Sequence, residues 1–189
     1  MKTGQTRLTS KALLFILLLS IVVAAVPWIT MQRIDARLTE NPPNNGIVAF
    51  ELAENADHAR GMIDGWGPEL SILARKSIIV DFVFIPAYAF LFFSITMLMS
   101  LLSAGAPHAW VRRAAYLPFV SGLADVVENI FLLLILKSPH DIPSLYPRIA
   151  AWCAAVKFGL LALVVVVWII VALAWLIKRG ARKALGPAS

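Results

Sequence analysis

Charged residues are scarce in this sequence, and their scarcity excludes an ordinary soluble domain. Asp, Glu, Lys and Arg make up 15% of the 189 residues, whereas hydrophobic residues make up 60%. A soluble domain carries about 25% charged and about 45–50% apolar residues. The excess apolar surface, which gives a mean hydropathy of +0.80, must face something other than water. A lipid bilayer is therefore the expected partner.

Cysteine and metal-binding patterns are also nearly missing. The single cysteine, Cys153, lies inside an apolar run, so an internal disulfide is excluded. The three histidines, His58, His108 and His140, lie in three separate polar segments, and no C-x-x-C or H-x-x-x-H spacing accompanies them. No cofactor motif is present either, so we expect neither a metal nor a cofactor.

The net charge of +6 and the pI near 9.8 do not indicate nucleic-acid binding. Lys and Arg mostly flank apolar runs, whereas a nucleic-acid interface gathers them in a patch with interleaved aromatic residues. Their placement is instead typical of a signal for membrane topology.

Four apolar runs are long enough to cross a bilayer, whose hydrocarbon layer of roughly 30 Å takes about 20 helical residues. These runs are residues 12–29, 77–102, 114–136 and 149–177. Only helices satisfy their own backbone hydrogen bonds in lipid. The sequence therefore predicts an all-α polytopic membrane protein, with a four-transmembrane-helix bundle over residues 12–178 between a tail at 1–11 and a basic tail at 179–189.

The loop charges predict the orientation of this bundle. The two tails, counted with Lys178 at the end of the bundle, and the segment between the second and third runs carry nine basic and no acidic residues, whereas the long first loop, 30–76, carries five basic and seven acidic ones. Because positive loops stay in the cytoplasm, we expect both termini to be cytoplasmic, in the inner (plasma) membrane of a cell. The first loop then faces outward.

Two points about this bundle stay open. The first run has a basic start and the small residues Val23-Ala24-Ala25, so it also resembles a cleavable signal peptide, although Pro27 follows directly. The four runs contain no Gly-x-x-x-Gly pair, so the sequence does not say whether the bundle binds a protein partner or a second copy of itself.

The outward loop contains an amphipathic segment. Asn55 is a candidate helix cap, and Gly65-Trp66-Gly67-Pro68 is expected to end the short helix that follows. Its apolar residues recur at helical spacing, so one face is apolar: Ala59, Met62, Ile63 and Trp66. This helix either rests on the bilayer or caps the bundle, or it is a lid over an outward cavity with Glu51 pointing into it.

Four ionisable residues interrupt the apolar runs, namely Asp81, Asp125, Glu128 and Lys157. Each costs about 2.5–3.5 kcal/mol at a helix centre even on a lenient scale, so we expect all four to face inward and meet.

The third run carries most of this polar character. Asp125, Glu128, Asn129 and Ser121 recur at three- and four-residue spacing, so they share one helix face. In the second run, Tyr88 follows Asp81 by two turns on the same face.

Three functions are compatible with this predicted cluster. Three acids and one lysine leave a surplus of two negative charges, which favours binding of protons or cations. Buried polar groups also serve simply to join helices. An enzyme acting on a lipid or lipid-linked substrate is the third alternative, with Asp125 or Glu128 as acid or base, but no nucleophile–base pair supports it.

Several segments together suggest a family. They are Ile47 to Ala53 (IVAFELA), Trp66, Asp81 to Tyr88 (DFVFIPAY) and Asp125 to Asn129 (DVVEN). With these, the chain from Gly46 to about Phe158 resembles a family of bacterial four-span integral membrane proteins that has no settled activity. The resemblance implies an architecture but neither a substrate nor a mechanism.

Overall fold

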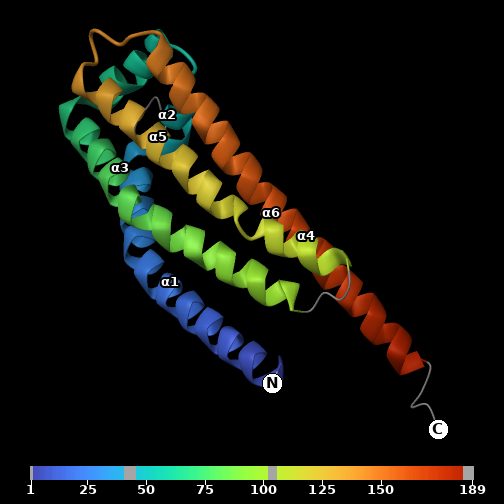
Figure 1. Ribbon diagram of the computed structural model, residues 1–189. Coiled ribbons are helices and arrows are strands. Elements are labelled where there is room, and N and C mark those ends of the chain that lie inside the picture. The colour runs from blue at the N-terminus through green and yellow to red at the C-terminus, as the bar shows by residue number, and fades with distance from the viewer. Residues whose placement is uncertain (1, 41–45, 102–105, 185–189) are drawn as a thin grey trace.

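The computed structural model describes residues 2–40, 46–101 and 106–184, and this described part is helical without strands. Figure 1 shows how the helices follow one another along the chain. They are α1 (Lys2–Thr39), α2 (Ile47–Glu51), α3 (Ala56–Ser100), α4 (Ala106–Ala114), α5 (Leu117–Lys137) and α6 (Leu145–Ala184).

Four helical stretches are long and apolar enough to cross a membrane, which confirms the expected all-α four-helix architecture. They are Ser10–Thr39, Ala56–Ser100, His108–Lys137 and Leu145–Ala181. Each extends beyond the apolar run that predicted it. Charged residues such as Arg33 and Arg37 are compatible with helix, so α1 continues to Thr39, and much of the segment 30–76 is helix instead of open loop.

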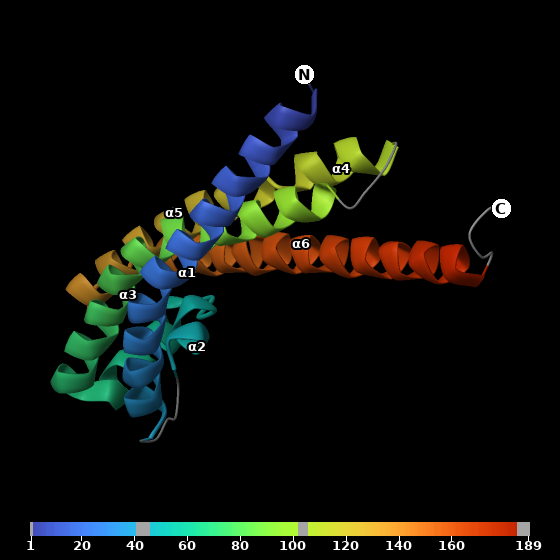
Figure 2. The ribbon, with the colours of Figure 1, turned by 90° about the horizontal axis from the view of Figure 1, so that it is seen from below.

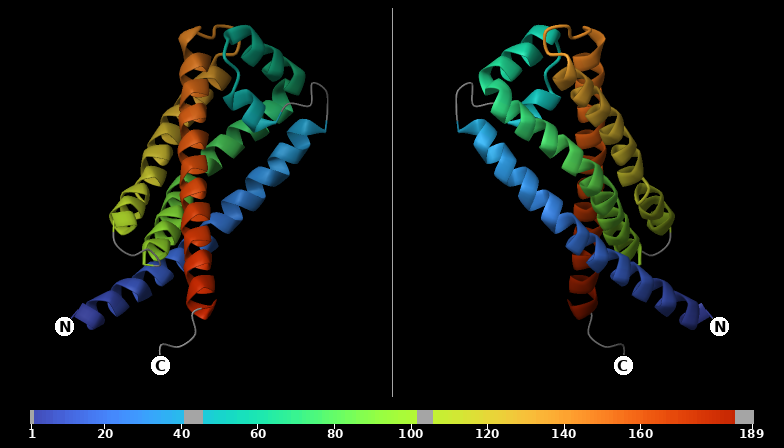
Figure 3. Two further views of the ribbon diagram at one scale, coloured as in Figure 1. Left: turned by 90° about the vertical axis from the view of Figure 1, so that its right-hand side faces the viewer. Right: turned by 90° about the vertical axis from the view of Figure 1, so that its left-hand side faces the viewer.

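The long helices pack in the order α1, α3, α5, α6, and α3 also contacts α6. Both termini lie at one end of the molecule, as an even number of crossings requires (Figures 1 and 3). We call this the terminal end. At the opposite end, which we call the α2 end, α2 lies between the last turns of α1 and the first half of α6 (Figures 2 and 3).

The largest apolar core lies at the α2 end. Phe50 of α2 is 1% exposed and packs edge-on against Trp66, with ring centroids 5.2 Å apart. Leu38 from α1 and Leu132 from α5 join this core and are fully buried. The amphipathic face predicted in the first loop is buried here as a whole (Ala59, Met62, Ile63 and Trp66). This segment therefore caps the bundle.

The start and the bend of α3 follow the predicted local signals. The Asn55 side chain accepts a hydrogen bond from the His58 backbone N–H at 2.8 Å, as an N-cap does. Gly67 has φ 66° and ψ −177° and breaks the helix direction just before Pro68. This conformation is essentially restricted to glycine, so the predicted end of the short first piece is confirmed as a bend within α3.

Replacing the glycine at this bend tests its role. Gly67→Ala is expected to lower the free energy of unfolding by about 1–3 kcal/mol, because alanine would be strained at this φ and ψ. Gly61→Ala is the matched control, since a Cβ at Gly61 meets open space within a regular helix and should stabilise the protein by about 0.5–1 kcal/mol. Thermal unfolding of both variants in detergent measures the difference, and equal effects would contradict the assigned backbone strain.

Candidate functional site

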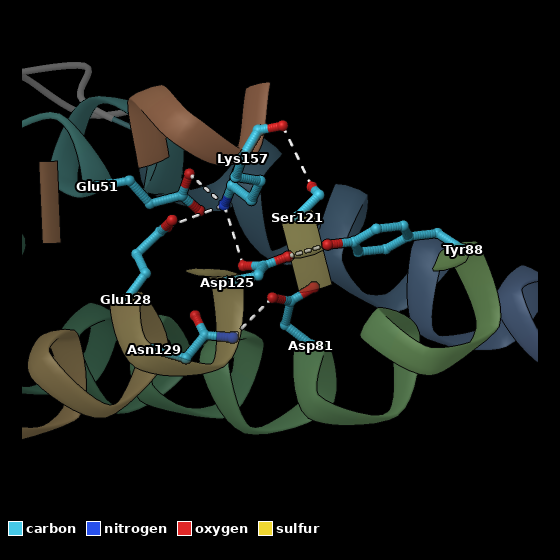
Figure 4. A network of polar contacts seen from close by, with 8 residues as sticks. All are labelled: Glu51, Asp81, Tyr88, Ser121, Asp125, Glu128, Asn129 and Lys157. Carbon is cyan, nitrogen blue, oxygen red and sulfur yellow. Dashed lines mark hydrogen bonds and ion pairs between the residues drawn. The ribbon is translucent and has the colours of Figure 1, made fainter. Parts of the chain in front are cut away.

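The ammonium group of Lys157, on α6, is surrounded by three carboxylates (Figure 4). Its Nζ lies 2.9 Å from Glu128 Oε1, 3.1 Å from Asp125 Oδ1 and 3.2 Å from Glu51 Oε2. Asp125 and Glu128 are on α5, one turn apart, whereas Glu51 is the last residue of α2. All four side chains are nearly withdrawn from solvent, with exposed fractions of 0% to 11%. We call these four residues the Lys157 cluster.

Three further side chains extend this network. Tyr88 donates its hydroxyl to Asp125 Oδ2 at 2.9 Å, and Asn129 donates its amide to Asp81 Oδ2 at 2.7 Å. Ser121 donates its hydroxyl to the backbone carbonyl of Lys157 at 3.2 Å. These contacts join the second, third and fourth spans, as the sequence predicted.

Local sequence explains why α5 supplies most of the network. Its polar residues recur at three- and four-residue spacing and are all buried, whereas Leu123 and Val127 on the other face are 68% and 40% exposed. Gly122 lies on the buried face, where an added Cβ would come 3.1 Å from Ile85 Cγ2. A glycine at this position thus permits the close approach of α3 and α5 that brings Tyr88 to Asp125.

Glu51 reaches the cluster because α2 is held at both ends. The carboxylate of Asp35, near the end of α1, accepts a hydrogen bond from the Ile47 backbone N–H at 2.7 Å. A Cβ at Gly46 would collide with this carboxylate, so any larger residue there would displace the Asp35 side chain. At its other end α2 is anchored by the buried side chain of Phe50. Glu51 therefore points inward, as the lid hypothesis expected.

The charges of the site do not balance. Four carboxylates (Glu51, Asp81, Asp125 and Glu128) face one ammonium group. Asp125 receives a donor on each oxygen, from Lys157 and Tyr88. Glu128, by contrast, has a buried Oε2 that receives no hydrogen bond. A buried carboxylate oxygen without a donor costs about 1–3 kcal/mol or more, so this atom is the one best placed to carry a proton.

The Glu51 carboxyl lies within hydrogen-bonding reach of Glu128, so a proton on either group can bridge the two. Burial raises the pKa of Glu51 above its ordinary value of 4.5. The nearby ammonium of Lys157 opposes this rise, whereas the negative charge of Asp125 adds to it. Glu51 is therefore more easily protonated in the folded protein than in the unfolded chain.

A cavity of about 450 Å³ reaches the cluster from one side. Its polar wall is formed by Asp35, Glu51, Asp81, Asp125, Asn129 and Lys157. Its apolar wall includes the rings of Trp28, Phe84, Tyr88, Phe92 and Phe158. Trp28, Val48 and Phe158, from α1, α2 and α6, are each 42–52% exposed. We call these three exposed lining side chains the rim of the cavity.

Sequence reasoning found most of the site but not all of it. Asp81, Asp125, Glu128, Asn129 and Lys157 were predicted as one cluster and do lie together. Glu51, predicted only as an accessory residue outside the spans, instead contacts Lys157 directly. Asp35 was missed altogether, because nothing distinguishes it from other charged residues near a helix end.

The site offers little for nucleophilic or metal chemistry. Within residues 2–40, 46–101 and 106–184, no group of three or more His, Cys, Asp or Glu side chains is arranged to hold a metal ion. The ammonium of Lys157 occupies the point where the three carboxylates converge. The Ser121 hydroxyl is bound to a backbone carbonyl, and the His108 ring contacts the Ser100 carbonyl at 2.8 Å, outside the network.

Removing the central ammonium should destabilise the fold. Lys157→Met leaves three carboxylates buried without a counter-charge, and the loss of one partner from a buried ion pair costs about 3–5 kcal/mol. Adding Glu128→Gln to this variant should restore part of the loss, because it removes one of the stranded charges. Thermal unfolding in detergent measures both effects. Lys76→Met, at an exposed lysine, is the control and should stay within about 0.5 kcal/mol of the wild type.

The raised pKa of Glu51 makes stability depend on pH. Above pH 4.5 the unfolded chain releases a proton that the folded protein retains, so stability should fall as the pH rises through this region. Glu51→Gln should lose less stability over the same range. Melting temperatures between about pH 4 and pH 9 measure the slopes, with Glu54→Gln, at an exposed acid, as the control. Parallel slopes for Glu51→Gln and the wild type would contradict the assignment.

Comparison with known proteins adds no family to this geometry. No protein-family model, curated protein or solved structure matches the chain. The resemblance to bacterial four-span proteins therefore stays a prediction, and the arguments for a function come from the site itself.

Proposed function

We propose that this chain is a small integral membrane protein whose Lys157 cluster takes up and releases protons, or binds a cation in their place. The observation that carries the proposal is the imbalance of three carboxylates within 2.9–3.2 Å of one ammonium. In a low-dielectric interior, such a surplus of negative charge is neutralised by a bound proton or another cation. The buried Oε2 of Glu128, which receives no hydrogen bond, supports this atom as the one that takes up the proton.

The cavity gives access to the Lys157 cluster, which favours the exchange of protons with the surroundings over a permanently trapped proton. Glu51, Asp125 and Lys157 all line the 450 Å³ cavity, whereas Glu128 lies behind them and is fully buried. A proton entering through the cavity meets Glu51 first and can pass to Glu128, because the two carboxyl groups are within hydrogen-bonding reach. This path requires no motion of the long helices.

The location that we propose follows from the charge distribution. Both tails and the segment between the second and third spans are basic without acids, so both termini face the cytoplasm of a bacterial cell and the protein lies in the inner membrane. The α2 end and the cavity near it then face outward. Protons or cations would reach the cluster from that side.

A purely structural role is the second candidate, and one observation favours it. Lys157 joins α2, α5 and α6 and has an acceptor for each of its three N–H bonds, which is what a group that fixes helix packing needs. In that case the surplus proton would be trapped and would never exchange. The enzyme alternative has no comparable support, because the Ser121 hydroxyl donates to the backbone carbonyl of Lys157 and not to a base.

Proton exchange separates the two candidates. Acid–base titration of the purified full-length protein in detergent should show about one proton fewer exchanged between about pH 4 and pH 9 in Glu128→Gln than in the wild type. In liposomes with an internal pH dye, the wild type should move protons or monovalent cations, and Glu128→Gln and Asp125→Asn should slow this movement about tenfold.

Asp57→Asn is the matched control, because this acid is 95% exposed and lies outside the cluster. It should titrate and transport like the wild type. Identical titration curves for folded Glu128→Gln and wild-type protein, together with liposome fluxes equal to those of protein-free vesicles, would overturn the proposal and leave the structural role.

A further inference from the structure

We propose that the 450 Å³ cavity beside the Lys157 cluster is a binding site for an organic ammonium ion with an apolar body. The inference rests on the proposed function, since the carboxylates that would exchange protons also face this cavity. It goes further by naming the chemical class of the ligand. Three features of the cavity carry it: charge, aromatic walls and an open rim.

The charge of the cavity wall selects for cations. Four acids line it, Asp35, Glu51, Asp81 and Asp125, whereas Lys157 is its only basic residue among those that the structure describes. Lys157 is also engaged by its three carboxylates, so it is poorly able to hold an anion as well. A phosphate or carboxylate ligand would therefore meet net negative charge, which is strongly repulsive in a low-dielectric site.

The aromatic part of the cavity wall suits an apolar cation better than an inorganic one. The rings of Trp28 and Phe84 lie 5.7 Å apart, and those of Phe84 and Tyr88 lie 5.5 Å apart, so three aromatic rings form one continuous surface. Aromatic faces attract ammonium groups, most strongly where water is excluded. A small hydrated metal ion gains little from such a surface, whereas an alkyl- or arylammonium gains from both the rings and the acids.

Asp81 is the acid best placed to meet this ligand. It lines the cavity, but it does not contact Lys157 within salt-bridge distance, and its hydrogen-bond donor is the neutral amide of Asn129. It lies one turn before Phe84 on α3, so an ammonium group near Asp81 is also near the aromatic surface. The negative charge of Asp81 is thus not neutralised by an ion pair of its own.

The size and the opening of the cavity agree with a small organic ligand. Ligand sites typically have volumes of about 300–1,000 Å³ and mostly apolar walls with a few polar groups. The rim is formed by exposed side chains of Trp28, Val48 and Phe158. Trp28 and Phe158 belong to helices that are apolar enough to cross a membrane. An amphipathic cation dissolved in the bilayer could therefore enter sideways between α1 and α6.

Benzyltrimethylammonium is a suitable probe, because it cannot lose a proton and has an exact carbon isostere, neopentylbenzene. Binding of each compound to the full-length protein in maltoside detergent is followed by ligand-observed NMR, with empty micelles as the blank. The wild type should bind the ammonium compound saturably. Asp81→Asn should weaken this binding about tenfold and leave that of neopentylbenzene unchanged. Asp57→Asn should change neither.

A second variant keeps the test decisive if Asp81→Asn fails to fold. Trp28→Leu alters a half-exposed rim residue and removes no charge. It should weaken binding of the ammonium compound about two- to fivefold relative to its isostere, because a cation–π contact is lost. No saturable binding to the wild type, or equal weakening of both compounds in each folded variant, would overturn the inference.

The ammonium group could belong to a free metabolite or to a lipid headgroup, and one more measurement separates them. Dihexanoylphosphatidylcholine is added as a soluble competitor. Displacement of the probe supports a lipid with a choline headgroup, and no displacement supports a free ammonium compound. Both results support the ammonium chemistry of the site.

Failure of this inference is distinguishable from failure of the proposed function. If Glu128→Gln removes one exchangeable proton but the probe does not bind, only the ligand assignment is wrong. If the probe binds with the expected dependence on Asp81 but the titration curves of Glu128→Gln and wild type coincide, proton exchange is wrong and the cation site stands.

Discussion

The ammonium group of Lys157 joins parts of the chain that have no other polar connection of comparable strength among the described residues. It binds carboxylates on α2 and α5 from its own position on α6. Separated from one another in an apolar interior, these charges would each cost several kcal/mol. Together they compensate much of that cost, and the compensation requires α2, α5 and α6 to keep their relative positions.

The same interaction links the cap at the α2 end to the long helices. α2 has only five residues, too few to be stable alone, and it is held by the Asp35–Ile47 hydrogen bond, the burial of Phe50 and the Glu51 ion pair. A change of charge at Glu51 therefore acts on the position of α2 as well as on the cluster. In the function that we propose, proton binding and the shape of the cavity are coupled through this one side chain.

The proposed function depends on incomplete neutralisation of the buried carboxylates. A lysine paired with a single acid would form a site without net charge, which would not attract a further cation. Here the surplus of acids faces a cavity on one side and is sealed from solvent on the other, where Glu128 is fully buried. The aromatic residues Trp28, Phe84 and Tyr88 complete the cavity from two further helices, so a binding surface exists only when α1 packs against α3.

The sequence by itself determined the four spans, the helical class and the buried face of α5. These depend on hydropathy, length and helical periodicity, which are local properties of the chain. The high cost of charge in lipid also predicted that Asp81, Asp125, Glu128 and Lys157 would meet. Only the tertiary structure decided that Glu51 joins them, that Asp35 positions α2 and that a cavity adjoins the cluster. Those features depend on how segments far apart in the sequence are placed in space, and no local pattern encodes that placement.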